Sequence, residues 1–261
     1  MRILVTNDDG IDAAGLAILT EAARQLTDDV WIVAPATEQS GQSHAVTLTD
    51  PLRIARLDEK RFAVSGTPAD CVTMALEVAM DAPPDLVLSG VNQGFNVADD
   101  MLYSGTVGAA MQASASGIRA IAFSQAYKRL GQEHDEDIWM AAQGHCGSTL
   151  QTLAALDHDP KTVLNVNFPA CPAEEVEGLE VVFEEDAIEA IAELAATANE
   201  QLENIGARRL VTIVERVFEE ASFDAPERVT SGKTELRITG PFVREQVAPV
   251  VADADLSNFV L

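Results

Sequence analysis

The sequence contains no long apolar run. None of its 261 residues belongs to an uninterrupted apolar stretch of about 18 residues, the length that a membrane-spanning helix needs. It also lacks the apolar segment and small-residue cleavage site of a secretory signal peptide, because strand-like residues follow Met1 and Arg2 directly. We therefore expect a cytoplasmic protein without a membrane partner.

Basic residues are scarce as well. Lys and Arg together number 17 against 42 Asp and Glu, which gives a net charge of −25. Proteins that bind nucleic acid generally use clustered Lys and Arg, so we expect no general nucleic-acid binding. A phosphorylated substrate would therefore need a metal ion as a bridge to this chain. The acidity also fits a solvated surface, as in a chain adapted to high salt, and we favour this interpretation as its main cause.

Cysteine is rare, and its spacing is uninformative. The three cysteines, Cys71, Cys146 and Cys171, are an odd number and include no C-x-x-C pair. This pattern predicts reduced thiols instead of a disulfide framework or a zinc site.

The first 172 residues are rich in short apolar runs that end in Gly or Pro and alternate with helix-like stretches. The expected strands are residues 3–5, 30–34, 62–64, 86–88, 120–123 and 163–166, and the clearest helices are 16–26 and 71–80. The alternation predicts an α/β domain, Rossmann-like, with a mostly parallel sheet and helices on both faces.

From about residue 173 the pattern changes to longer amphipathic segments. Apolar residues recur at helical spacing in 186–204 and 207–221, and residues 235–239 alternate like a strand. We expect a smaller, mainly helical C-terminal domain with a short strand. The predicted domains are residues 1–177 and 178–261.

Polar residues follow the expected strands of the first half. Ligands of open parallel sheets bind beyond the carboxyl ends of the strands, so the four segments that follow the first four strands could converge on one pocket. These segments are residues 7–10, 35–44, 65–70 and 89–96.

Two adjacent carboxylates, Asp8 and Asp9, leave the first strand. They repel each other unless a cation lies beside them, and oxygen ligands suit a hard ion such as Mg²⁺ or Mn²⁺. Ser40 and Asn92 could complete such a metal site. The alternative is an ordinary turn, because Asn, Asp and Gly are common turn residues.

Ser104, Gly105 and Thr106 stand where a helix of small residues begins. Free backbone N–H groups and hydroxyls at a helix N-terminus can hold a phosphate. The alternative is a plain Ser or Thr cap. Beside a metal site, we favour phosphate binding.

The motifs T-N-D-D-G-I, A-P-x-x-E-Q-S-G, S-G-T-P-A-D-C-V, S-G-V-N-x-G-x-N and Y-S-G-T-V-G-A-A together resemble the SurE family of metal-dependent nucleoside-monophosphate phosphatases, over residues 1–182. The resemblance implies hydrolysis of 5′- or 3′-nucleotides, sometimes of short polyphosphate, and a homo-oligomer. The metal ligands that it implies are Asp8, Asp9, Ser40 and Asn92, and the residues near the phosphate are Asn96, Ser104, Gly105 and Thr106.

The reaction expected from this resemblance is in-line attack of a metal-activated water on phosphorus. Asp8 and Asp9 are the best candidates for the catalytic base that accepts the proton of that water, and His44 is a weaker one.

Residues 178–261 resemble a different protein. The segments F-E-E-D-A-I-E-A-I-A, E-N-I-G-A-R-R-L-V-T-I-V-E-R-V and D-A-D-L-S-N-F-V-L are similar to the C-terminal domain of HslU, the ATPase subunit of a bacterial proteasome-like protease. The hairpin and helix that SurE proteins exchange when they dimerise are not recognisable here. The alternative function is therefore a catalytically silent chimera, a binding module that contacts an HslV-like peptidase through residues 255–261.

Overall fold

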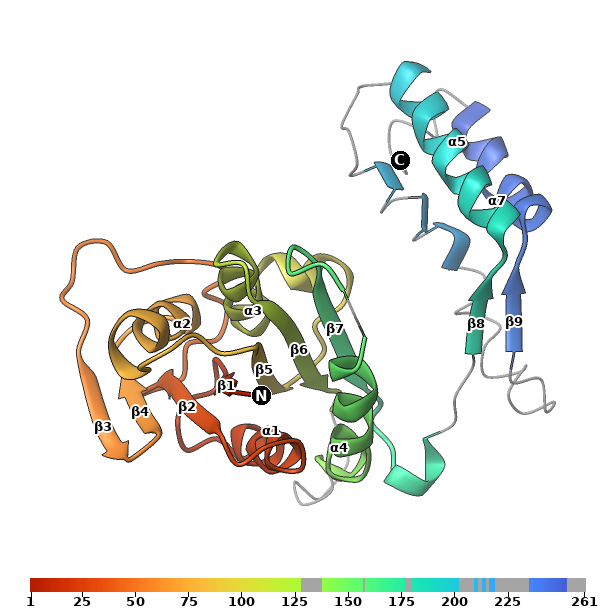
Figure 1. Cartoon of the computed structure of the whole chain (residues 1–261). Coiled ribbons are helices and arrows are strands. Elements are labelled where there is room, and N and C mark those ends of the chain that lie inside the picture. Colours follow the sequence, from red (N-terminus) through yellow and green to blue (C-terminus); the bar gives the residue numbers. More distant parts are fainter. Residues whose placement is uncertain are drawn as a thin grey trace. The chain divides into compact units, whose positions relative to one another are not determined.

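A seven-stranded sheet forms the centre of the first unit of the chain, Met1–Val176, in this computed structural model (Figure 1). Its strands are β1 (Ile3–Thr6), β2 (Val30–Pro35), β3 (Ile54–Asp58), β4 (Arg61–Val64), β5 (Leu86–Gln93), β6 (Arg119–Gln125) and β7 (Val163–Phe168). The order across the sheet is β3-β4-β2-β1-β5-β6-β7, and every neighbouring pair is parallel except β3 with β4. The predicted strands and the mostly parallel sheet are confirmed, and β3 is an addition.

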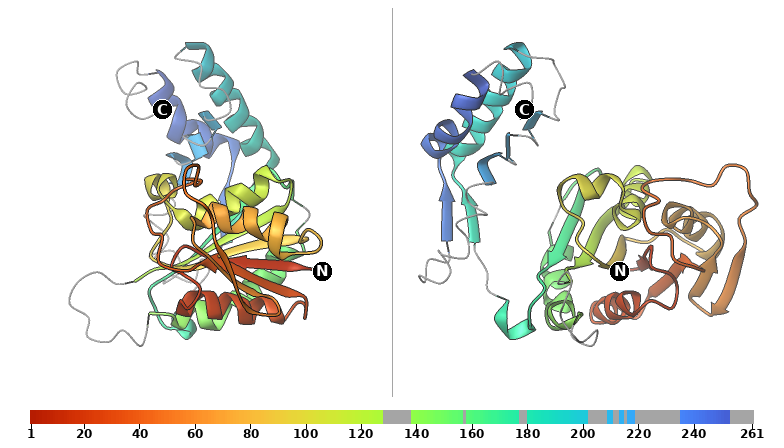
Figure 2. Two further views of the ribbon diagram at one scale, coloured as in Figure 1. Left: turned by 90° about the vertical axis from the view of Figure 1, so that its left-hand side faces the viewer. Right: turned by 180° about the vertical axis from the view of Figure 1, so that it is seen from behind.

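Helices cover both faces of this sheet, as predicted (Figure 2). On one face, α1 (Ala14–Arg24) and α4 (Met140–Ala154) share a core with Ile3 and Val5 of β1. On the other face, α2 (Pro68–Met74) and α3 (Gly105–Ala115) share a second core with Leu4. Because consecutive residues of β1 face opposite cores, the strand is apolar throughout, as expected for a strand buried on both sides.

The start of α2 depends on the segment S-G-T-P-A-D. The Asp70 N–H donates to Thr67 Oγ1 at 3.1 Å, and the Thr67 N–H donates to Asp70 Oδ2 at 2.9 Å, which forms a capping box. Pro68 follows the cap, where its fixed φ favours a helix. The predicted helix 71–80 therefore begins earlier, and it continues beyond Met74 as a short π-helix, Ala75–Ala79.

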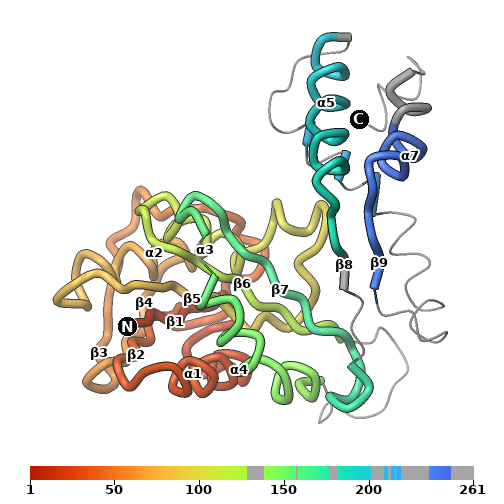
Figure 3. The backbone as a smooth tube through the Cα atoms, turned by 45° about the vertical axis from the view of Figure 1, so that its right-hand side comes forward, coloured from red at the N-terminus to blue at the C-terminus, as the bar shows by residue number. Residues whose placement is uncertain are grey.

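The second unit, Glu177–Leu261, has a core of its own. Strands β8 (Glu180–Phe183) and β9 (Glu235–Ile238) pair in parallel and lead into α5 (Glu185–Gln201) and α7 (Gly240–Ala252), as the tube in Figure 3 shows. The predicted helix 186–204 and strand 235–239 correspond to α5 and β9, and β8 was not predicted. Ile213, Ile238 and Val243 are among the fully buried residues that fill this core.

The structure describes residues 1–127, 138–156, 158–176, 180–201, 209–210, 213–214, 216–218 and 235–252. The predicted helix 207–221 lies partly outside these ranges, and its described residues are helical. The C-terminal tail, residues 255–261, lies wholly outside them. Within the described ranges, every helix is too short or too polar to cross a membrane. All three cysteines are free, and Cys71 and Cys146 are buried.

Candidate functional site

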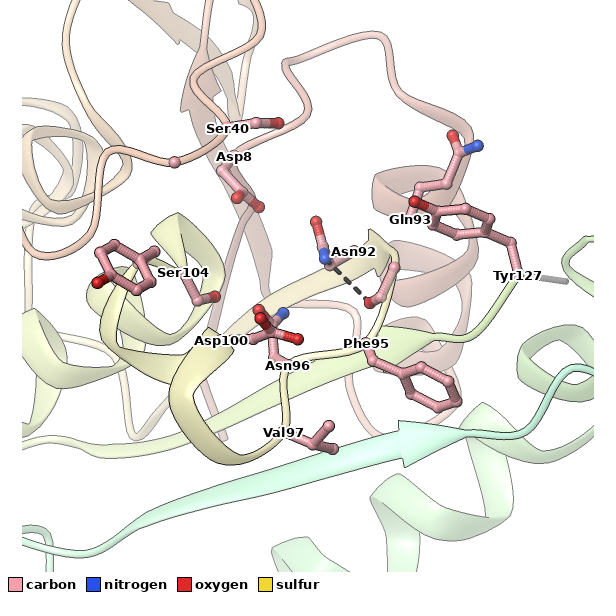
Figure 4. Close-up of a pocket in the computed structure, with 13 residues that line it drawn as sticks. Asp8, Ser40, Asn92, Gln93, Phe95, Asn96, Val97, Asp100, Ser104 and Tyr127 are labelled. Carbon is pink, nitrogen blue, oxygen red and sulfur yellow. Dashed lines mark hydrogen bonds between the residues drawn. The ribbon is translucent and has the colours of Figure 1, made fainter. Parts of the chain in front are cut away.

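A pocket of about 660 Å³ opens where β1 and β5 end (Figure 4). The sheet order reverses between these two strands, which is where ligands of doubly wound sheets bind. The pocket is lined by Asp8 after β1, Ser40 and Gly41 after β2, residues 92–97 at the end of β5, Asp100, Tyr103 and Ser104 before α3, and Tyr127 after β6. The ends of β1, β2 and β5 therefore converge, as predicted, and residues 65–70 cap α2 instead of lining the pocket.

The turn after β1 is built by Asn7 and Gly10. The Asn7 amide donates to the Gly10 carbonyl at 3.0 Å, and its Oδ1 accepts from the Gly10 N–H at 3.2 Å. Gly10 has a φ of +108°, which a residue with a side chain rarely adopts. The turn interpretation of N-D-D-G is therefore correct for Asn7 and Gly10, and it leaves both aspartate side chains available for other contacts.

Asp8 is almost completely buried, with 3% of its surface exposed, although it borders the pocket. Its Oδ1 accepts a hydrogen bond of 2.6 Å from the Thr106 hydroxyl in the first turn of α3. Gly105 allows this approach, because a Cβ at that position would lie 2.8 Å from the Asp8 Cβ and 2.9 Å from Oδ2. The N-terminus of α3 thus packs directly against the carboxylate.

Burial raises the pKa of Asp8 to about 6. The hydrogen bond from the Thr106 hydroxyl acts in the opposite direction, and the neighbouring charge of Asp9 raises the pKa further. Asp8 is therefore a carboxylate whose charged form is costly in the metal-free protein.

Asp9 does not line the pocket, and its contacts lie on the β5 side of the turn. Its Oδ2 accepts from the Gln93 N–H at 3.3 Å. Burial raises the pKa of Asp9, the Gln93 N–H lowers it, and the charge of Glu38 raises it again. Both members of the predicted carboxylate pair therefore have raised pKa values, chiefly because both are withdrawn from water.

Asn92 and Ser40 bring neutral oxygens to the same opening. The Asn92 amide donates to the Gly94 carbonyl at 3.0 Å, which turns its Oδ1 toward Asp8 and Ser40 (Figure 4). The Ser40 hydroxyl donates to Glu38 Oε1 at 3.0 Å. Among the described residues, no three His, Cys, Asp or Glu side chains form a metal-binding group. The predicted ligand set of two carboxylates, an amide and a hydroxyl consists only of hard oxygen atoms, which fits Mg²⁺ or Mn²⁺.

Of the four predicted phosphate residues, Asn96 and Ser104 line the pocket, whereas Gly105 and Thr106 lie behind its wall, against Asp8. Ser104 caps α3, since its Oγ accepts from the Val107 N–H at 3.0 Å, and it also lines the pocket. Asn96 is 4% exposed, and its amide donates to Ser124 Oγ at 2.8 Å. Thr106 is fully buried and uses its hydroxyl hydrogen on Asp8. Ser104 is therefore both a cap and a pocket residue, so the two interpretations are compatible.

His44 lies apart from this group. Its Nε2 is 2.9 Å from Gln112 Oε1 on α3, and it is not among the residues that line the pocket. The pocket also includes three aromatic residues that sequence analysis did not single out, Phe95, Tyr103 and Tyr127. Each stands within a few residues of a predicted site residue or strand end, and this proximity is the signal that could have identified them.

Comparison with known proteins gives a consistent result. Residues 3–188 match the family described as Survival protein SurE. The chain is 53% identical over 183 residues to 5'-nucleotidase SurE of Methylobacterium sp. (strain 4-46), and the aligned region covers 70% of this chain and 72% of that protein. It is 52% identical over 182 residues to 5'-nucleotidase SurE of Methylocella silvestris, with coverage of 69% and 71%.

The fold has a counterpart among solved structures. A crystal structure of the SurE protein from Aquifex aeolicus superimposes with a TM-score of 0.62 at 36% identity, over 70% of this chain and 72% of that one. With a family match that spans residues 3–188, the chain belongs to the SurE family.

Proposed function

We propose that this protein is a metal-dependent phosphatase that hydrolyses nucleoside monophosphates, 5′ or 3′, to nucleoside and phosphate. The observation that carries the proposal is Asp8, a buried carboxylate that borders the pocket and is held by the N-terminus of α3. Relatives with 53% and 52% sequence identity to this chain are named 5'-nucleotidase SurE. A buried carboxylate with a raised pKa inside a pocket is a common mark of a catalytic site.

The metal would be held by Asp8, Asp9, Ser40 and Asn92. Burial disfavours the charged forms of both aspartates, and a divalent cation would remove that cost. When bound, Mg²⁺ or Mn²⁺ polarises the phosphoryl oxygens and lowers the pKa of a coordinated water.

The residues of the chain then supply orientation and proton transfer. Asp8 is the preferred base, because it borders the pocket and the Thr106 hydroxyl fixes one of its oxygens. Ser104 and Asn96 line the wall where the phosphate would lie, and the N–H groups at the start of α3 add a favourable dipole. Because Gly105 has no side chain, the N-terminus of α3 can lie next to Asp8.

The aromatic residues of the pocket favour a nucleoside over a simple alkyl group as the remainder of the substrate. Phe95 and Tyr127 are 49% and 48% exposed, and both lie on the far side of Asn92 from Asp8 (Figure 4). Partly exposed aromatic rings that line a pocket suit stacking with a nucleobase. This arrangement separates a phosphate end from a base end within one pocket.

The direct test is turnover of a nucleoside monophosphate by the purified protein with Mg²⁺, with Mn²⁺ and with EDTA. We expect activity only with a metal, and a loss of at least about 100-fold in Asp8→Ala, since proton transfer and charge stabilisation are both removed. The exposed carboxylate Asp28 provides the matched control, and Asp28→Ala should retain wild-type turnover. Activity in EDTA, or full turnover by Asp8→Ala, would contradict the proposal.

The HslU-like interpretation of residues 178–261 stays a prediction, as do the homo-oligomer and the cytoplasmic location. The family match ends at residue 188, just inside α5. A peptidase-binding role would require the tail, and it can be tested by mixing an HslV-like peptidase with the protein before and after deletion of residues 255–261. A stimulation of peptidase activity that disappears with the deletion would support docking, and equal activity in all samples would rule it out.

A further inference from the structure

The loop that follows β5 carries the middle of the pocket wall, and it is attached to the neighbouring strands. Phe95, Asn96 and Val97 line the pocket from this loop (Figure 4). Just before them, the Gly94 N–H donates to the Gln125 carbonyl at the end of β6, at 2.9 Å. The loop therefore leaves β5 and crosses the ends of β6 and β7.

At Asn96 the backbone is held by side chains of β7. The Asn96 N–H donates to Asn167 Oδ1 at 2.9 Å, and Asn167 Nδ2 donates back to the Asn96 carbonyl at 3.2 Å. Asn165 Nδ2 donates to the same carbonyl at 2.8 Å. Three hydrogen bonds thus fix one peptide segment of the pocket wall.

The chemistry of this contact depends on a carboxamide side chain. An amide side chain offers one acceptor and one donor side by side, so Asn167 pairs with a backbone in the way that an adjacent strand residue would. Asn96 is 4% exposed, and buried backbone groups without partners are costly. β7 is the last strand of the sheet, and its side chains supply the partners that this backbone segment lacks within the loop.

The positions of the two asparagines follow from the strand. Asn165 and Asn167 are two residues apart, so they project from the same face of β7, and β6 pairs them with Ala122 and Ser124. Ser124 also accepts a hydrogen bond from the Asn96 side chain at 2.8 Å. The backbone and the side chain of Asn96 are therefore oriented together.

We propose that Asn167, assisted by Asn165, is a positioning residue of the active site. It holds the Asn96 peptide so that Phe95, Asn96 and Val97 keep their places in the pocket wall, and its loss weakens substrate binding without touching the metal ligands. This inference rests on the proposed function, because it concerns the substrate of the same pocket.

The test compares the wild type with Asn167→Leu, which keeps the size of the side chain and removes both hydrogen bonds. Hydrogen–deuterium exchange over residues 94–97 should become about tenfold faster, and kcat/KM for a nucleoside monophosphate should fall about tenfold through KM. Calorimetric affinity for Mn²⁺ should not change. Asn167→Asp, which retains the acceptor for the Asn96 N–H, should give an intermediate loss. The exposed Thr162, which precedes β7 at its opposite end, supplies the control Thr162→Ala.

Unchanged exchange over residues 94–97 in Asn167→Leu would overturn the proposal, as would faster exchange with an unchanged KM. If Asn167→Leu does not fold, Asn167→Asp and Asn165→Leu, which each remove a donor to the Asn96 carbonyl, decide the question by the same measurements. If the wild type shows no turnover, the proposed function is wrong, but the positioning role of Asn167 is still tested, because the exchange data show whether Asn167 holds the loop.

Discussion

The two units of the chain differ in what they bury. In Met1–Val176 many buried side chains are polar: Thr6, Asn7, Asp8, Thr20, Thr67, Asp70, Ser89, Asn96, Ser104, Thr106, Ser124 and Gln125. In the described part of Glu177–Leu261 only Arg209 belongs to this class. Buried polar groups cost free energy unless they are paired, so their concentration around the β1 and β5 ends marks the region where chemistry competes with packing.

Apart from Arg209, the buried residues described in the second unit are apolar. The core of its described residues consists of Ala, Ile, Val, Leu and Phe, and ion pairs such as that of Arg244 with Glu193 lie on the surface. The two units are therefore under different constraints. Changes near the pocket of the first unit should alter turnover, and changes in the core of the second unit should alter its stability and leave turnover unchanged.

The largest expected effect concerns the second core. Ile238 is fully buried in β9, so Ile238→Ala should destabilise that unit by about 2–5 kcal/mol through lost burial and a cavity. Turnover at 25 °C should not change. The matched variant Ile121→Ala, at an equally buried position in β6, should shorten the survival of activity on heating. Thermal unfolding and residual activity after heating are measured for both variants. A loss of turnover in Ile238→Ala at 25 °C would show that the second unit also contributes to activity.

A second prediction concerns the cost of charge at Asp8. Its pKa is raised to about 6 in the folded chain, above the value of an unfolded aspartate, so above pH 6 the charged form destabilises the metal-free protein. Asp8→Asn, which keeps the acceptor for Thr106, should be more stable than the wild type by up to about 3 kcal/mol at pH 8 in EDTA. The difference should vanish as the pH falls through 6 to below 4. Urea unfolding at pH 8 and pH 4 tests this, and a less stable Asp8→Asn at pH 8 would disprove it.

A third, smaller effect separates two roles of Thr106. Thr106→Val removes the hydrogen bond to Asp8 and should lower kcat about tenfold, while Thr106→Ser keeps the hydroxyl and should retain most of the rate. Steady-state kinetics, with inhibition by inorganic phosphate as a binding measure, gives the answer. If KM and the phosphate inhibition constant change and kcat does not, Thr106 serves the phosphate directly.

The smallest effect should be the same in both units. Glu193→Ala breaks the exposed pair with Arg244, and Asp12→Ala breaks the exposed pair with Arg61. Each should change the free energy of unfolding by no more than about 0.5 kcal/mol, because solvent screens exposed pairs. Neither should change turnover. A large loss at only one of the two positions, seen by urea unfolding, would show that the surfaces also differ.

Much of the fold was predictable because the main strands are buried on both faces. Their apolar runs are continuous, and the Gly and Pro residues that end these runs can be recognised in the sequence. β3 was missed because Arg56, Leu57 and Asp58 are exposed at the antiparallel edge of the sheet, where neither apolar continuity nor regular alternation is required. β8 was missed because residues 178–182 could belong to either of the two resembled proteins.

The candidate site was predictable where a residue type carries the chemistry, as with Asp8, Ser40, Asn92 and Ser104. Contacts that depend on tertiary distance were not. Thr106 is 98 positions from Asp8, and Asn167 is 71 positions from Asn96. The alternation N-V-N in β7 was a usable signal, because two polar residues on one face of an apolar strand predict a specific partner on that face.

The turn after β1 assigns its geometry and its charge to different side chains. Asn7 and Gly10 close the loop with their own hydrogen bonds, and neither bond uses the carboxylates of Asp8 and Asp9. The turn therefore closes without the side chains of residues 8 and 9, whose partners lie on α3 and at the end of β5. A substitution at either position should therefore change the chemistry of this strand end and leave the two hydrogen bonds that close the turn in place.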